Sequence, residues 1–249
     1  MELRLFPEPT GAHITPYSLG SDGMYRCLDE QRSIHCVGLC EGSLVMTDSG
    51  AQRLPDRDRL LEWAVQDAAL DGFGRFVSGA LVVPTFSRSI LEALVRVVMR
   101  QIVTRQQARS TIAHFIREYG VSEMELFGFP ADATIRSLVP GDFARLGLGF
   151  RSARLVDAIA AACDEGALLG GRLRGVGPWS RAVLESDIRK DFSHYPMCDK
   201  SGQVAGRALG IDLEDLRIRD PLLAADLYVY ALSWIEVEGR PDQGRGSRT

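Results

Sequence analysis

The sequence predicts an α+β fold in which a small N-terminal antiparallel sheet domain precedes an all-α domain. Residues 1–50 hold short apolar runs separated by proline, glycine and aspartate, a pattern typical of three to five antiparallel strands. From Ser87 onward, apolar residues recur at helical spacing instead. We therefore expect a mixed β/α domain over residues 1–84, a helical domain over 85–238 and a flexible tail over 239–249.

Local signals predict the individual helices. In the first domain, the apolar spacing predicts a helix over 56–70, followed by a connection with room for a strand over 79–83. In the second domain, Ser89 and Glu92 fit a capping box that starts a helix ending near Met99. Further helices are expected at 105–119, 132–138, 141–146, 151–164, 179–188, 201–209 and 221–236.

Composition narrows the class of protein. Apolar residues make up 45% of the chain and charged residues 25%, as in ordinary soluble globular proteins. The chain has no run of about 18 apolar residues and no secretory signal pattern at its start, so we expect a cytoplasmic protein without a membrane partner. The five cysteines are scattered and form no CxxC pair, so we expect no metal site and no cofactor.

The charge of the chain is unevenly distributed. A formal net charge of −4 disfavours nonspecific binding to nucleic acid. Arginine nevertheless supplies nearly all the positive charge, and four arginines recur at steps of four or five residues: Arg96, Arg100, Arg105 and Arg109. Such a stripe is either a solvated helix face or a face that contacts phosphates, and the sequence leaves both open.

The segment LRGVGPWSRAVL at 173–184 combines a tight turn with a helix start. Gly175, Val176 and Gly177 can form a sharp turn that exposes backbone N–H groups, and Pro178 suits the first turn of a helix. Such a hairpin can bind a phosphate, because its amides and the helix dipole point the same way. The alternative is a short loop between two packed helices.

Four segments together resemble the helix-hairpin-helix DNA glycosylases, and within that superfamily they are most similar to bacterial 3-methyladenine DNA glycosylase II. They are RQIVTRQQA (100–108), LGLGFRSARLVDAIAAACDEG (146–166), RGVGPWSRAVL (174–184) and LYVYALSWIE (227–236). The resemblance covers most of 87–238. It implies that the helical domain is a glycosylase domain which flips a damaged or modified base from duplex DNA and cleaves its N-glycosidic bond.

The resemblance also assigns the catalytic residue. The family has an essential aspartate about twenty residues after the position of Trp179, and Asp199 lies at that distance. A fixed carboxylate would stabilise positive charge on the sugar or deprotonate the attacking water. The alternatives are that Asp199 only caps a helix and that Trp179 belongs to the core.

The remaining site residues follow from the same resemblance. The segment 100–108 would contact DNA and insert an apolar wedge at Ile102, and the hairpin would hold a phosphate. The implied DNA-binding residues are Gln101, Ile102, Arg105, Arg174, Gly175, Val176 and Gly177. The implied base pocket consists of Trp179, Tyr230 and Trp234, whose rings could stack on the base.

The residue at position 179 indicates the type of reaction. Relatives that also nick the strand carry a lysine there, which forms a Schiff base, and Trp179 cannot do so. Lys200, the neighbour of Asp199, is the one alternative amine that we consider. We therefore expect a monomeric, monofunctional enzyme that acts on duplex DNA carrying a modified base and leaves an abasic site.

The sequence departs from the family pattern at several positions. Only eight residues separate Gly166 from Gly175, where the family has a longer connection. Arg174 replaces the usual proline before the hairpin, and Cys198 replaces a second acid before the aspartate. Two alternatives therefore stay open: a glycosylase-derived DNA-binding protein with weak or no catalysis, and an unrelated helical protein with a chance GVG loop.

Overall fold

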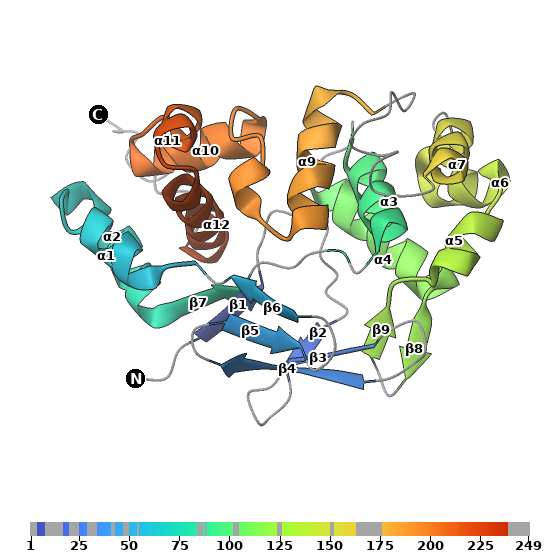
Figure 1. Ribbon diagram of the computed structural model, residues 1–249, viewed down its shortest axis with the longest axis horizontal. Coiled ribbons are helices and arrows are strands. Elements are labelled where there is room, and N and C mark those ends of the chain that lie inside the picture. Colours follow the sequence, from blue (N-terminus) through green and yellow to red (C-terminus); the bar gives the residue numbers. More distant parts are fainter. Residues whose placement is uncertain are drawn as a thin grey trace, which may run out of the picture. The chain divides into compact units, whose positions relative to one another are not determined.

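The computed structural model describes residues 55–83, 87, 89–101, 105–123, 126–149, 152–162 and 176–238, and six strands between residues 4 and 53 (Figure 1). The chain folds into two compact units, each built from separate parts of the sequence. The first unit comprises Met1–Thr10, Leu54–Pro84 and Phe192–Thr249, and the second comprises Gly11–Arg53 and Thr85–Asp191. The predicted tail at 239–249 lies outside the described residues.

The first unit is organised around one long buried helix, α12 (Pro221–Glu238). A parallel strand pair, β1 (Arg4–Pro7) and β7 (Ala80–Val83), lies in the same unit. The Tyr230 hydroxyl of α12 donates to the Ala80 carbonyl of β7 at 3.2 Å and accepts from the Val82 N–H at 3.4 Å. The other elements of this unit are α1 (Arg57–Ala64), η1 (Ala68–Leu70), α2 (Asp71–Gly79), η3 (Phe192–His194), α10 (Lys200–Leu209) and α11 (Leu213–Arg219).

The second unit combines an antiparallel sheet with helices. Its five strands pair in sequence order: β2 (Tyr17–Leu19), β3 (Tyr25–Leu28), β4 (Ile34–Cys40), β5 (Ser43–Met46) and β6 (Gly50–Arg53). A second antiparallel pair consists of β8 (Val121–Glu123) and β9 (Leu126–Gly128). The helices are α3 (Ile90–Arg100), α4 (Arg105–Tyr119), α5 (Asp132–Ser137), α6 (Pro140–Phe143), the π-helix η2 (Ala144–Leu148), α7 (Ser152–Ala161) and α9 (Pro178–Arg189).

The predicted fold class, an N-terminal antiparallel sheet domain followed by an all-α domain, is wrong. Strands β2–β6 form no domain of their own, because they belong to the same compact unit as the helices of Thr85–Asp191. Strand β1 is separated from them and pairs in parallel with β7, far along the chain. The helical part is not all-α either, since β8 and β9 interrupt it. Pro84 does mark a boundary between units, but the units are discontinuous rather than consecutive.

Helix α3 is buried along most of its length, and its start confirms the predicted capping box. The Ser89 hydroxyl accepts the N–H of Glu92 at 3.1 Å, which satisfies one of the free donors of the first turn. Every residue from Leu91 to Met99 is buried, including the charged pair Glu92 and Arg96. The two side chains form an ion pair of 2.6 Å, and the Arg96 guanidinium lies 5.2 Å from the ring centre of Phe129. The Arg96 guanidinium therefore interacts with groups inside the fold and not with solvent.

A half-buried carboxylate on α9 continues this polar cluster. Asp187 accepts the backbone N–H and the hydroxyl of Ser87, each at 2.6 Å. Burial raises the pKa of Asp187, and the Arg96 charge and the Ser87 hydrogen bonds only partly oppose that shift. The two Ser87 hydrogen bonds tie α9 to the segment before α3, and the Arg96 charge also favours the ionised carboxylate.

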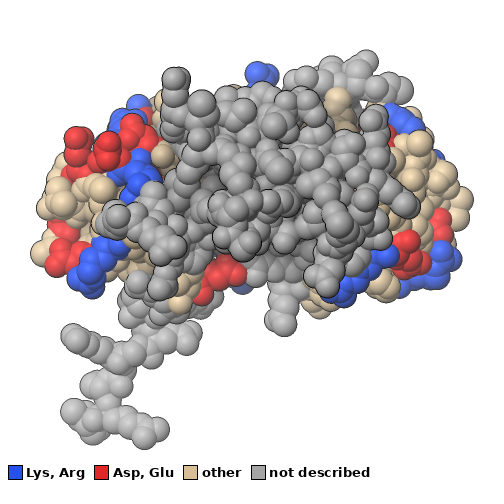
Figure 2. All heavy atoms as spheres, turned by 90° about the horizontal axis from the view of Figure 1, so that it is seen from below, with Lys and Arg blue, Asp and Glu red and all other residues tan. Residues whose placement is uncertain are grey.

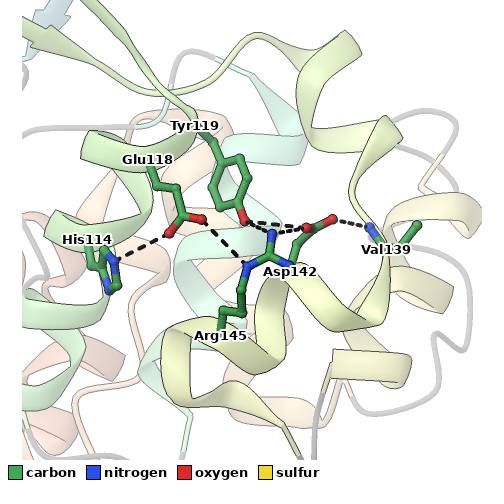
Figure 3. A network of polar contacts seen from close by, with 6 residues as sticks. All are labelled: His114, Glu118, Tyr119, Val139, Asp142 and Arg145. Carbon is green, nitrogen blue, oxygen red and sulfur yellow. Dashed lines mark hydrogen bonds and ion pairs between the residues drawn. The ribbon is translucent and has the colours of Figure 1, made fainter.

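An exposed network joins the end of α4 to α6 and η2 (Figure 3). Asp142 accepts the N–H of Val139 at 2.8 Å and pairs with Arg145, and these contacts lower the pKa of the Asp142 carboxyl. Arg145 also donates to the Tyr119 hydroxyl at 3.0 Å and lies near Glu118. Because these side chains sit close to solvent, we assign the network a local role in orienting η2.

None of the helices in the described part of the chain is long and apolar enough to cross a membrane.

We predict that Asp187→Ala lowers the free energy of unfolding by about 3 kcal/mol, because it leaves two buried Ser87 donors without an acceptor. Asp187→Asn keeps an acceptor and removes a charge that burial disfavours, so its cost should stay below about 1.5 kcal/mol. Urea denaturation measures both. Asp157→Ala, at an exposed position of α7, is the control. Equal losses in the alanine and asparagine variants would contradict this account.

Candidate active site and nucleic-acid interface

Asp199 caps helix α10. Its Oδ1 accepts the N–H of Gly202 at 2.7 Å, and its Oδ2 accepts the hydroxyl of Tyr195 at 3.3 Å. A helix N-terminus presents unsatisfied N–H groups and a positive dipole end, so it favours a carboxylate at this position. The side chain is half-buried. The alternative that Asp199 caps a helix is therefore confirmed. Its carboxylate is at the same time held in place and partly open to solvent.

The chain before Asp199 forms a tight turn against α10. The Asp199 N–H donates to the Pro196 carbonyl at 3.3 Å, and the Gln203 side chain donates to the Cys198 carbonyl at 3.2 Å. Gly202 lies directly beneath this turn: a Cβ added there would lie 1.7 Å from the Met197 carbonyl oxygen. Only glycine allows the turn to approach the helix this closely.

Helix α11 holds the same turn from another side. The Glu214 carboxylate pairs with Arg217, and the backbone N–H groups of Met197 and Cys198 face it and help to lower its pKa. The hydrogen bond from Arg217 is the main reason that the pKa of Glu214 is lowered, and its charge and the two backbone N–H groups add to this effect. The two residues before Asp199 are thus tied to an ionised side chain.

An aromatic cluster lies under the turn, and the sequence analysis missed it. The Tyr195 ring is buried against Tyr228 of α12, with ring centres 4.9 Å apart, and Phe192 packs at 5.8 Å from Tyr195. The rings fix the Tyr195 hydroxyl that reaches Asp199. The sequence offered one signal for this cluster: the segment HYPMCD has a tyrosine four residues before the aspartate.

The start of α9, in the other unit, follows two described residues of the predicted hairpin, Val176 and Gly177. Val176 is buried, Gly177 is exposed at the N-cap and Pro178 occupies the first turn, as predicted for a helix start. Gly177 has φ −79° and ψ −179°, an extended conformation that does not itself require glycine. An added Cβ at Gly177 would meet nothing within 4 Å. Its exposure, rather than its backbone angles, makes this position open to a ligand. Arg174 and Gly175 lie outside the described residues.

The beginning of α9 is joined to the end of α3. The Gln101 side chain, at the C-cap of α3, donates to the hydroxyl of Ser180. Trp179, next to Ser180, is half-buried. The structure therefore brings the predicted DNA-binding residue Gln101 to the hairpin helix. Ile102, the predicted wedge, follows Gln101 directly and lies outside the described residues.

Two residues of the predicted base pocket belong to the core instead. Tyr230 is 0% exposed, its hydroxyl is bonded to β7, and burial raises its pKa to about 12. Trp234 is 7% exposed and packs edge-on against Phe73, with ring centres 5.6 Å apart. A ring covered on both faces cannot stack on a base. Trp179 remains the candidate for that role.

The arginine stripe does not form one face. Arg96 is 5% exposed and paired inside the fold, so it neither contacts solvent nor reaches phosphates. Arg105 begins α4, a different helix from that of Arg96, and its side chain lies outside the described residues. On the face drawn in Figure 2, acidic and basic side chains of the described residues lie interspersed. Lys200, at the first position of α10, is exposed.

The sequence matches no known family model, and it matches no curated protein. The fold does match solved structures. The 3-methyladenine DNA glycosylase from Archaeoglobus fulgidus is 17% identical, with a TM-score of 0.64 over 91% of this chain and 93% of that one. The 8-oxoguanine glycosylase/lyase of Clostridium acetobutylicum, in complex with double-stranded DNA containing cytosine opposite 8-oxoguanine, is 14% identical, with a TM-score of 0.58 over 88% and 87%. Its apo form gives 14% and 0.52 over the same shares.

These matches show that the chain has the same fold as these two DNA glycosylases. A match over 88% of the chain is too long to be confined to residues 85–238, so the likeness extends beyond the predicted helical domain. The likeness does not distinguish one family of glycosylases from another.

We predict that Tyr230→Phe lowers the free energy of unfolding by about 1 to 3 kcal/mol, because the buried N–H of Val82 and carbonyl of Ala80 lose their partner. DNA binding and base release, measured at a temperature where the variant is folded, should equal those of the wild type. A specific loss of base release at unchanged stability would return Tyr230 to the base pocket.

Proposed function

We propose that the protein is a monofunctional DNA glycosylase, which hydrolyses the N-glycosidic bond of a damaged or modified base in duplex DNA and leaves an abasic site. The observation that carries this proposal is the Asp199 carboxylate, which is fixed by Gly202 and Tyr195 in a fold shared with DNA glycosylases. The distance of Asp199 from Trp179 in the sequence matches the family pattern.

The chemistry fits a carboxylate held in this way. Breaking an N-glycosidic bond builds positive charge on the sugar, and a negative group that is already in place stabilises this charge without reorganising. Each Asp199 oxygen has one hydrogen-bond partner of known position, so the side chain cannot rotate freely. The side chain is half-buried, so the fixed charge is not fully enclosed by the protein.

DNA binding is supported by the second unit. Exposed Gly177 at the start of the 12-residue helix α9 leaves its first backbone N–H groups without a side-chain cap, the arrangement that a phosphate uses. Gln101 connects this helix start to the segment of the proposed wedge, so the two proposed DNA contacts would move together. Trp179 would stack on the flipped base.

A DNA-binding protein without catalysis is the second candidate, because the cap on α10 alone would account for Asp199. Base release by the wild type decides between the two functions. The assay uses duplexes that carry methylated, deaminated or oxidised bases, with mass spectrometry of the released base.

We predict that Asp199→Asn lowers the rate of base release by about a hundredfold or more, because the transition state loses a fixed negative charge. Asparagine is as good an N-cap as aspartate, so α10 and the thermal stability should be preserved. Asp56→Asn, which changes the N-cap of α1 in the same unit, is the matched control and should keep wild-type activity. Similar rates in both variants would remove Asp199 from the mechanism.

A second prediction concerns the product. With Trp179 at the lysine position of the family, we expect alkali-labile abasic sites and no direct strand nick. Denaturing electrophoresis with and without alkali distinguishes these products. Borohydride trapping of a covalent protein–DNA adduct would contradict the prediction, and its loss in Lys200→Ala would identify Lys200 as the amine.

A further inference from the structure

We propose that Tyr195 and Glu214 are positioning residues, which hold the turn Pro196–Asp199 so that the Asp199 carboxylate is preassembled for catalysis. The inference rests on the proposed function and deepens it, because it names groups that would act through Asp199. Neither residue belongs to the motifs that the sequence resembles.

The first contact acts on the carboxylate itself. The Tyr195 hydroxyl donates to Asp199 Oδ2 at 3.3 Å, while the Gly202 N–H occupies Oδ1. These two donors approach different oxygens, so together they define the plane of the carboxylate. The Tyr195 ring cannot move away, because it is buried against Tyr228 and Phe192.

The second contact acts on the backbone before the carboxylate. The N–H groups of Met197 and Cys198 face the Glu214 carboxylate and help to lower its pKa. Arg217 holds Glu214 in place through an ion pair and two hydrogen bonds. Gly202 closes the third side, since its Cα lies against the Met197 carbonyl. The turn is therefore fixed from α10, from α11 and from the aromatic cluster. A displacement of about 1 Å at a catalytic group can lower a rate a hundredfold.

The chain offers a matched control for each contact. Asp215, the neighbour of Glu214, forms the same kind of ion pair on α11, with Arg219 at 3.0 Å, but both side chains of this pair are largely exposed. Tyr228 is buried in the same aromatic cluster as Tyr195, on α12. Asp215→Asn and Tyr228→Phe therefore remove the same chemical groups without the contacts to the turn.

The experiment compares Glu214→Gln with Asp215→Asn, and Tyr195→Phe with Tyr228→Phe, in the full chain. Three quantities are measured: the single-turnover rate of base release from the modified duplex that the wild type processes, the Kd for a duplex with an abasic analogue, and amide hydrogen exchange of the turn. We expect the rate to fall about tenfold or more in Glu214→Gln and Tyr195→Phe, with Kd unchanged. The Met197 and Cys198 amides should exchange faster in Glu214→Gln.

The controls should keep the wild-type values of all three quantities. Rates in Glu214→Gln and Tyr195→Phe that equal those of their controls would overturn the proposal. It would also be overturned by a loss of rate that parallels a loss of DNA binding, because a general structural defect would lower both. If the wild type releases no base from any duplex, the proposed function fails. The exchange measurement then still tests Glu214: faster exchange of the Met197 and Cys198 amides in Glu214→Gln would show that Glu214 holds the turn, and unchanged exchange would show that it does not.

Discussion

The hydrogen bond between the Gly202 N–H and Asp199 is the constraint around which the candidate site is built. A helix start needs an acceptor for its free N–H groups, and a short carboxylate satisfies that need at the N-cap. The bond fixes the direction of the Asp199 side chain and places its charge at the positive end of α10. Helix cap and catalytic carboxylate are thus compatible descriptions of one residue, since the geometry that the helix requires also immobilises the charge.

Local signals in the sequence predicted most helices. The Ser89 cap, the helix over Arg105–Tyr119 and the start of α9 at Pro178 are all confirmed, because caps, periodicity and proline act within a few residues of each other. Helix α2 was missed because Gly72 and Gly74 weaken its propensity, although Phe73, Phe76 and Val77 recur at helical spacing and are buried. Burial of these three side chains stabilises α2 despite the low helix propensity of its glycines.

Long-range pairing was the part that the sequence could not reveal. Strand β1 pairs with β7 across more than seventy residues, and no local pattern names a partner at that distance. The same limit affected the site. Tyr230 and Trp234 were assigned to a pocket because they are aromatic, yet α12 is apolar on all sides, which is the mark of a buried helix. The composition of LYVYALSWIE therefore contained the evidence for a core role.

The glycines of α10 show how a fold can sacrifice helix propensity to build a turn. Glycine inside a helix costs about 0.5 to 1 kcal/mol relative to alanine, and α10 contains two, Gly202 and Gly206. They lie four residues apart, on one face, and each is approached by a backbone carbonyl: that of Met197 at the start and that of Ile211 at the end. A side chain at either position would push the adjoining turn away from the helix. The turn at Gly202 is the one that carries Asp199, so the loss in propensity is offset where the carboxylate has to be held still.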